Sequence, residues 1–162
     1  MFDKVFEIMQ LSFPKDEYRP YEEQKALLDD SRYKITAYND NGIVKGFMAL
    51  WEFEGFVFLE HFAVHPDFRN EGIGSKMLGD LIGEKKVCLE VEPPENDITK
   101  RRIEFYRRNG FYFNEYPYIQ PPISKGKNSV PLYIMTTENA VSENEFTEIK
   151  NTLYKEVYKC KI

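Results

Sequence analysis

The spacing of hydrophobic residues predicts that the chain begins with two helices. Between residues 2 and 13 the apolar side chains recur every three or four positions, as on one face of an α-helix. Pro14 ends this pattern, because proline cannot donate the hydrogen bond that a continuing helix needs. Pro20 can begin a second helix, whose apolar side would be residues 26–28.

From residue 33 the pattern changes to that of β-strands. Residues 33–38 alternate apolar and polar side chains, and Asn41-Gly42 is a typical two-residue hairpin turn. Residues 43–53 form the returning strand, and residues 56–64 form a third, heavily apolar strand. We expect these three strands to pair antiparallel.

The rest of the chain alternates helices and strands. Ser142 and Glu145 are spaced as a capping box, which marks the start of the last helix. A long loop with Pro and Gly residues, 117–130, joins the last two strands. The expected elements are helices over 73–82, about 98–108 and about 142–159, and strands over 87–91, 111–116 and 131–136.

The order of these elements indicates the fold class. The strand–helix–strand–helix–strand stretch in the middle favours parallel pairing, and the hairpins at either end favour antiparallel pairing. We therefore expect an α/β (α+β) protein with a mixed, centrally parallel sheet of about six strands, flanked by helices and followed by an added C-terminal helix. The 162 residues suit one domain, 1–162.

Composition narrows the class of protein. The net charge of −5 at pH 7 argues against nucleic-acid binding, which favours a basic surface. The N-terminus is unlike a signal peptide, and no stretch approaches the roughly 18 apolar residues of a membrane span. Cys88 and Cys160 fit neither a disulfide framework nor a zinc site. We expect a cytoplasmic monomer or homodimer with no metal and no membrane partner.

One short stretch carries the candidate chemistry. FRNEGIGSKML, residues 68–78, places a basic residue and two glycines between a strand and a helix. Backbone N–H groups at a helix start, together with the positive end of the helix dipole, bind phosphate oxygens. Glycine lets the backbone approach the phosphate closely, and Arg69 can add a direct charge. The stretch therefore predicts a phosphate-binding loop.

The spacing of the glycines excludes two common phosphate motifs. A Walker A loop needs G-x-x-x-x-G-K-[ST], and GIGSK has the wrong order. The dinucleotide fingerprint needs a third glycine where this chain has Met77. The pattern Arg69-x-x-Gly72-x-Gly74 instead resembles the pyrophosphate motif of the GNAT superfamily of N-acetyltransferases, which bind acetyl-CoA.

This resemblance covers roughly residues 33–136. Residues 60–78 resemble the fourth strand, loop and helix of the family, and IEFYRRNGF, residues 103–111, resembles its tyrosine-bearing helix. The chain departs from the family pattern where Thr99 and Arg102 replace a common Asn and Ala, and its first strand is missing or much shortened. The family fold implied is the same mixed α/β sheet.

The resemblance also implies a cofactor site and a reaction. Acetyl-CoA would be the co-substrate, and a primary amine of a small molecule or peptide would attack its thioester directly. The strand backbone at residues 62–64 would hold the pantetheine as an added strand does. The implied cofactor-binding residues are Phe62, Ala63, Val64, Arg69, Asn70, Glu71, Gly72, Ile73, Gly74 and Ser75.

Two catalytic residues are expected. The resemblance places Tyr106 beside the cofactor sulfur, where its hydroxyl can hydrogen-bond or protonate the leaving thiolate, unless the ring only packs. Glu60 would take the ammonium proton, or else it is a carboxylate paired within the sheet. His61 would point to the opposite face, Glu92 is a weaker candidate base, and Cys88 would be inert core.

Two other readings stay open from the sequence: a non-catalytic acyl-CoA-binding or regulatory module, and a nucleotide-phosphate binder of another fold. The N-terminal helices and the loop 117–130 would build the acceptor pocket. One or two basic residues of the helix near 98–108 would meet the nucleotide phosphate, unless all form a solvated face. Those residues are Lys100, Arg101, Arg102, Arg107 and Arg108.

Overall fold

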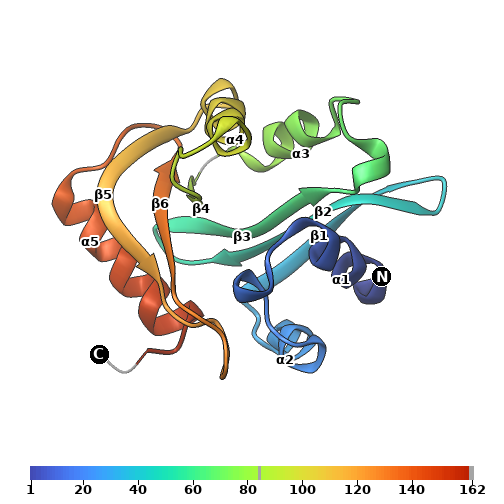
Figure 1. Cartoon of the computed structure of the whole chain (residues 1–162), viewed down its shortest axis with the longest axis horizontal. Helices are drawn as coiled ribbons and strands as arrows, with labels where there is room; N and C mark the ends of the chain where they lie inside the picture. The colour runs from blue at the N-terminus through green and yellow to red at the C-terminus, as the bar shows by residue number, and fades with distance from the viewer. Residues whose placement is uncertain (84, 161–162) are drawn as a thin grey trace. The chain divides into compact units, whose positions relative to one another are not determined.

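The computed structural model describes residues 1–83 and 85–160 (Figure 1). The chain forms two compact units, Met1–Val87 and a second that starts at Cys88. The helices are α1 (Phe2–Ser12), α2 (Tyr21–Ala26), α3 (Ile73–Leu81), α4 (Asp97–Arg108) and α5 (Glu143–Thr152). The strands are β1 (Tyr33–Asp40), β2 (Ile43–Glu52), β3 (Phe56–Val64), β4 (Lys86–Val91), β5 (Tyr112–Gln120) and β6 (Val130–Thr136). Every element expected from the hydrophobic pattern is present.

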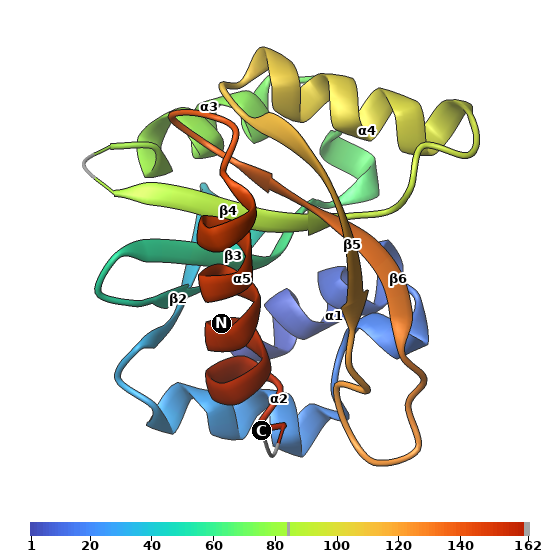
Figure 2. The same ribbon diagram turned by 90° about the vertical axis from the view of Figure 1, so that its left-hand side faces the viewer.

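The first unit is built on the antiparallel strands β1, β2 and β3. Their pairing follows the Asn41-Gly42 turn, where both residues adopt the left-handed conformation. Helices α1 and α2 lie on one side of these strands and α3 lies on the other (Figures 1 and 2). Phe47, Trp51 and Phe58 are completely buried, so the strands supply much of the core of this unit.

Helix α2 differs from the sequence prediction in the face that it buries. Residues 26–28 were expected inside, but Ala26 and Leu28 are exposed and Gln24 is fully buried. Burial of Gln24 is possible because its amide group is satisfied: the backbone N–H of Arg19 donates to Oε1, and Nε2 donates to the Tyr33 hydroxyl. The apolar pattern alone could not reveal this.

A β-bulge interrupts the pairing of β2 with β3. Ala49 lies opposite His61 and Leu50 lies opposite Leu59, so Glu60 is an extra residue with no partner on β2. A bulge breaks the regular alternation of side chains. Accordingly, Glu60 and His61 both contact the segment between α1 and α2, and the prediction that His61 points away from Glu60 is wrong.

The second unit places β6 between β4 and β5, with both pairings antiparallel. Strand β5 extends to Gln120, beyond the expected end at residue 116, and is irregular between Asn114 and Tyr118. Helix α5 packs on β5 through ring contacts of Phe146 (Figure 2). The predicted capping box of Ser142 and Glu145 is confirmed, and a π-helical turn, Leu153–Val157, follows the helix.

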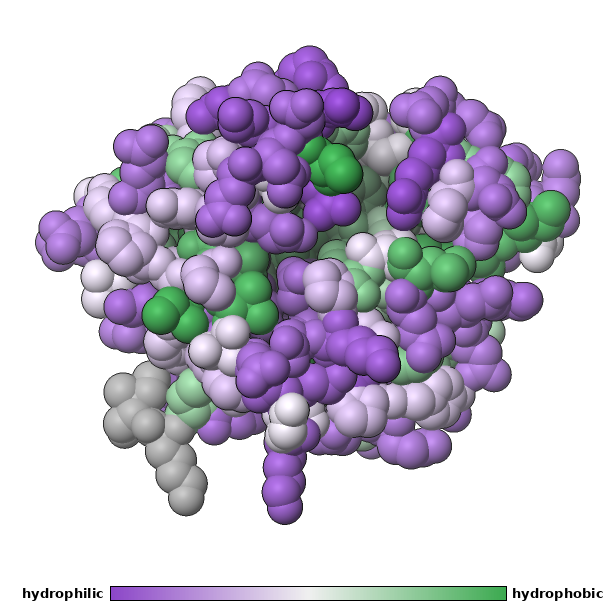
Figure 3. All heavy atoms as spheres, viewed as in Figure 1, coloured by the Kyte–Doolittle hydropathy of each residue, from purple (hydrophilic) through white to green (hydrophobic). Residues whose placement is uncertain are grey.

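One face of the molecule is mostly hydrophilic (Figure 3). Figure 3 shows hydrophilic residues over most of one face, with hydrophobic ones in small groups between them. Scattered exposed apolar residues are normal for a folded protein and need no partner to cover them. The large exposed hydrophobic residues are Met1, Leu11, Leu28, Ile43, Ile98, Tyr112 and Ile119.

Candidate functional site

The predicted phosphate loop connects the end of β3 to the start of α3. Gly72 is the N-cap of α3 and has φ +78°, a left-handed conformation in which side chains are strained. No side chain caps this helix, and its first backbone bond runs from Lys76 to Gly72. The N–H groups of residues 73–75 therefore have no partner within the helix, which is the arrangement that binds anions.

The exposure of this loop suits a ligand on its outer side. Asn70, Glu71, Gly72 and Ser75 are exposed, whereas the Ile73 side chain is buried and anchors the first turn in the core. Asn70 is also left-handed, with φ +67°, so two of three consecutive residues turn the chain sharply before the helix. The loop thus presents backbone rather than side chains at the helix start.

Arg69 was expected to add a direct charge to the phosphate site, but its side chain hydrogen-bonds within the protein. Its Nε–H donates to the Val64 carbonyl at 3.0 Å, and Nη2 lies 3.4 Å from the Ser12 hydroxyl at the end of α1. The side chain is turned back toward the end of β3, where it closes residues 64–69 into a loop. Its place in cofactor binding stays a prediction, and its contacts favour shaping the loop.

The strand residues expected to hold a pantetheine directly precede this loop. Phe62, Ala63 and Val64 pair with Met48, Phe47 and Gly46 of β2. Ala63 is buried, and Phe62 and Val64 are half-buried. A Cβ on Gly46 would come within 2.9 Å of the Ala63 carbonyl oxygen, so glycine allows the two strands to approach closely at this point.

Glu60 is the most tightly held carboxylate in the first unit. Its Oε2 lies 2.9 Å from Nη1 of Arg19, and the exposed fractions of the two side chains are 2% and 5%. The indole N–H of Trp51 donates to Oε1 at 2.8 Å. Burial alone would raise the pKa of Glu60, but the Arg19 charge and these contacts hold it below its usual value. The carboxylate is therefore ionised near neutral pH.

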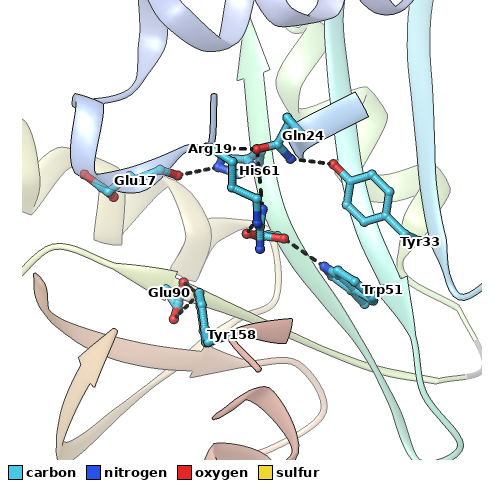
Figure 4. Close-up of polar contacts among 9 residues, drawn as sticks. Glu17, Arg19, Gln24, Tyr33, Trp51, His61, Glu90 and Tyr158 are labelled. Atoms are coloured by element: carbon cyan, nitrogen blue, oxygen red, sulfur yellow. Dashed lines mark hydrogen bonds and ion pairs between the residues drawn. The ribbon is translucent and has the colours of Figure 1, made fainter. Parts of the chain in front are cut away.

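His61 anchors the same segment of chain. Its Nε2–H donates to the Glu17 carbonyl at 2.6 Å (Figure 4). Its ring meets that of Phe13 edge-on. Burial lowers the pKa of His61, so the ring is neutral near pH 7. We call the group that these contacts connect the Arg19–Glu60 cluster. Its members are Glu17, Arg19, Gln24, Tyr33, Trp51, Glu60 and His61.

Arg19 is the residue of this cluster that sequence reasoning missed. A glutamate in a heavily apolar strand signals that a cation is needed nearby. However, 22 Lys and Arg residues are available, and nothing in the local pattern distinguishes Arg19 from the others. Only the fold brings residues 19 and 60 together.

In the second unit, Tyr106 lies on α4. The ring contacts Phe105 and Phe111 edge-on, with centroids 5.5 Å and 5.6 Å away. The side chain is half-buried, and its burial raises the pKa of the phenol to about 12. Tyr106 is therefore protonated at neutral pH and able to donate a hydrogen bond.

The other candidates on α4 lie at the surface. Arg102 pairs with Glu92 at 2.9 Å, and Arg107 pairs with Glu104. The basic residues of this helix are all exposed, as expected of a solvated face, and the alternative that one or two of them meet the nucleotide phosphate stays a prediction. Those residues are Lys100, Arg101, Arg102, Arg107 and Arg108.

A second carboxylate, not predicted as functional, is surrounded by tyrosines. Glu90 of β4 accepts a hydrogen bond from the Tyr158 hydroxyl at 2.7 Å (Figure 4) and another from the Tyr118 hydroxyl. Tyr158 follows the π-helical turn after α5, so these bonds attach the end of the C-terminal helix to the sheet of the second unit. Cys88 is fully buried, as expected for inert core.

Within residues 1–83 and 85–160, no three His, Cys, Asp or Glu side chains gather as metal ligands would. In the same described ranges, the helices are too short or too polar to cross a membrane.

Comparison with known proteins gives the family. The model of the acetyltransferase (GNAT) domain matches residues 30–112, half of the chain. The curated protein "Putative acetyltransferase YjbC" of Bacillus subtilis is 29% identical over 109 residues, which cover 65% of this chain. The match covers 55% of YjbC, so the chain spans about half the length of that curated relative.

Solved structures agree with this match. A "Putative acetyltransferase from GNAT family" of Bacteroides thetaiotaomicron is 34% identical, with 99% of this chain and 93% of that chain covered and a TM-score of 0.91. The ribosomal-protein-S18-alanine N-acetyltransferase of Escherichia coli is 23% identical, with coverages of 88% and 91% and a TM-score of 0.61. An aminoglycoside 6'-N-acetyltransferase complexed with coenzyme A is 16% identical, with coverages of 88% and 93% and a TM-score of 0.58.

At identities below 25% the last two structures show the fold alone. The first structure is similar in sequence as well, over almost the whole chain. The predicted fold class, a GNAT-like mixed α/β sheet flanked by helices, is confirmed. With a family model over half of its residues and a 34% identical structure over 99% of them, the chain belongs to the GNAT family of acetyltransferases.

Proposed function

We propose that this protein is an acetyl-CoA-dependent N-acetyltransferase that transfers an acetyl group to a primary amine of a small molecule or peptide. The observation that carries the proposal is the start of α3, where left-handed Gly72, at the end of the loop that follows β3, exposes uncapped N–H groups in a member of this family. A protein of the same fold is solved with coenzyme A, which supports that choice of phosphate compound.

The cofactor would lie along the first unit from β3 to α3. The pyrophosphate would accept hydrogen bonds from the N–H groups of residues 73–75, and the backbone at residues 62–64 would hold the pantetheine. Arg69 would support both parts, because its bond to the Val64 carbonyl joins the end of the strand to the loop. Asn70 and Glu71, both exposed, would border the phosphates.

The reaction needs no covalent enzyme intermediate. The neutral amine nitrogen bonds to the thioester carbonyl carbon, the carbon–sulfur bond breaks, and the nitrogen loses a proton to a base or water. The departing thiolate takes up a proton in turn. The main contribution of the protein is to hold amine and thioester together in the reactive geometry.

Tyr106 would stabilise the departing thiolate. Its pKa of about 12 is well above the ordinary thiol value of about 8.5, so full proton transfer to the sulfur is unfavourable. A hydrogen bond from the phenol is therefore the more effective help, and the sulfur would take its proton from solvent. This role requires only the hydroxyl.

Ligand-dependent melting tests the cofactor assignment. Acetyl-CoA and CoA should raise the melting temperature, because a ligand that binds only the folded state stabilises it by about 2.7 kcal/mol at 100 times its Kd. ATP at the same concentration should not. A comparable shift with ATP, or no shift with CoA, would refute the assignment.

Thiol release from acetyl-CoA tests the reaction. A panel of free amino acids, polyamines, other amines and peptides should contain at least one acceptor that accelerates the release. A melting shift without release for any amine would instead identify an acyl-CoA-binding module.

A further inference from the structure

We propose that Arg19 and Glu60 are positioning residues for acetyl transfer, because their buried ion pair holds the bulge of β3 that aims the backbone of residues 62–64 at the thioester. This inference rests on the proposed function. It assigns Glu60 the second of the two roles that the sequence leaves open, and it gives a role to Arg19, which no sequence pattern indicates.

Side chains hold the bulge at Glu60, the one residue of Val57–Val64 that lies opposite no residue of β2. The Trp51 side chain of β2 donates to one carboxylate oxygen of Glu60, and Arg19 lies 2.9 Å from the other. These side-chain contacts connect the bulge both to β2 and to the segment between α1 and α2.

A second contact strengthens the attachment at the next residue. His61 donates to the Glu17 carbonyl, and the Arg19 amide donates to buried Gln24 of α2 (Figure 4). The segment between α1 and α2 is thus bound to β3 at two consecutive residues. Phe62 follows at once, and a bulge re-aims the residues beside it, so a shift at Glu60 would displace the proposed pantetheine strand.

The contacts of Glu60 are poor for a proton acceptor. Oε1 accepts a hydrogen bond from Trp51, Oε2 lies against the Arg19 charge, and 2% of the side chain is exposed. A general base must come within hydrogen-bond reach of the proton that it takes. If Glu60 became protonated, the Arg19 charge would stay buried without its counter-ion, which is strongly unfavourable.

If the ion pair acts only by positioning β3, removing both charges together should reduce turnover less than removing one of them. Arg19→Met, Glu60→Gln and the double variant R19M/E60Q form the test. The exposed pair of Lys34 and Glu52, 2.5 Å apart in the same unit, gives the matched control K34M/E52Q. Each variant is compared for CoA-induced melting shift and for thiol release with the best amine of the panel.

Each single variant leaves one buried charge unpaired. We expect a lower melting temperature and turnover reduced roughly 10- to 100-fold, as for a small misplacement of reacting groups. The CoA-induced shift should persist, since the phosphate loop is unchanged. The double variant should recover to within about fivefold of the unmodified protein, because coupled residues give non-additive effects. The control should match the unmodified protein.

Two results would overturn the inference. A double variant as slow as Glu60→Gln, with both rates partly recovering at higher pH where more free amine exists, would show that the carboxylate itself accepts the proton. Full turnover in both single variants, despite lower melting temperatures, would show a purely structural pair.

If a single variant does not fold, Arg19→Lys replaces it. This variant keeps the charge but loses the planar guanidinium. Its turnover should therefore fall, while the CoA-induced melting shift should persist. Unchanged turnover would overturn the inference.

Hydrogen exchange separates this inference from the proposed function. In the CoA complex, or in the free protein if CoA does not bind, the amides of residues 62–64 should exchange faster in Arg19→Met and return to normal in the double variant. Absence of thiol release from the unmodified protein would refute the proposed function alone. Unchanged exchange in Arg19→Met would refute the positioning role.

Discussion

The phenol of Tyr106 is the single catalytic hydroxyl proposed here, and its removal isolates its contribution. Tyr106→Phe should keep the melting shift with acetyl-CoA, since the ring contacts with Phe105 and Phe111 remain. Turnover should fall roughly 10- to 100-fold, because the departing thiolate loses the hydrogen bond from the phenol. Steady-state thiol release measures it.

Tyr112→Phe is the matched control for this change. Tyr112 is 49% exposed on β5 and has been given no role in the reaction, so loss of its hydroxyl should leave turnover unchanged. Equal rates for Tyr106→Phe and the unmodified protein would reduce Tyr106 to a packing residue.

His61 should make the folded protein sensitive to mild acid. Burial lowers its pKa, so the folded state keeps the ring neutral while the unfolded chain binds a proton near the ordinary pKa of about 6.5. The unfolded state then holds more protons at acid pH. Stability from this residue is therefore full above about pH 6.5 and falls as the pH decreases below it.

Urea unfolding at several pH values between about 7.5 and 5 measures this loss. His61→Gln should flatten the dependence in that window, because glutamine does not titrate. Glu60 adds a second loss at lower pH: its pKa is depressed, so stability present above its ordinary value of 4.5 disappears as the pH falls through the folded value. A flat profile between pH 7.5 and 5 in the unmodified protein would contradict the His61 prediction.

At the scale of elements, the N-cap Gly72 of α3 and Gly79 within that helix differ in what their positions require of a residue. Gly72 has φ +78°, and nothing lies within 4 Å of a Cβ added there, so its requirement is conformational rather than steric. Gly72→Val should cost more than about 1–2 kcal/mol, the value for a left-handed residue with a Cβ, and abolish the CoA-induced melting shift. Differential scanning fluorimetry with CoA checks both.

Gly79 is the matched control in the same helix. A Cβ there also meets nothing within 4 Å, and no left-handed angle constrains it. Gly79→Ala should keep the CoA shift and raise stability by roughly 0.5–1 kcal/mol through helix propensity. A Gly72 variant that still responds fully to CoA would show that the phosphate loop is misassigned.

The segment between α1 and α2 shows how elements without a strong pattern acquire a role. It contains a short 3-10 turn, Lys15–Glu17, and has little regular structure of its own. Buried contacts from Arg19 and the Glu17 carbonyl nevertheless attach it to β3. If its placement determines that of the strand, changes in this segment will alter turnover without touching the cofactor.

For the whole molecule, one domain was expected, and the chain divides into two compact units. We predict a single cooperative thermal transition, because strand β4 begins at Lys86, before the boundary, and continues beyond it. Calorimetry with and without CoA measures this: one peak that moves as a whole agrees, and two peaks of which one responds would show units that unfold separately.

Much of this molecule is determined by local sequence. The hydrophobic period, with the positions of proline and glycine, predicts α1–α5 and β1–β6, although α2 buries Gln24 and not the apolar face expected. The helix start at Gly72 and the capping box of Ser142 and Glu145 follow from the chemistry of a few neighbouring residues. These features could be predicted because the interactions that produce them lie within one or two turns of chain.

Tertiary structure alone decided the surroundings of Glu60. One unpaired residue in β3 brings Glu60 and His61 to the same segment, and regular alternation cannot show where such a bulge occurs. The choice of Arg19 as counter-ion and the burial of Gln24 depend on where α2 packs against β1 and β3. Residues 19 and 60 meet only after the strands have paired, because ion-pair partners are selected by distance in space, and sequence spacing carries no information about that distance.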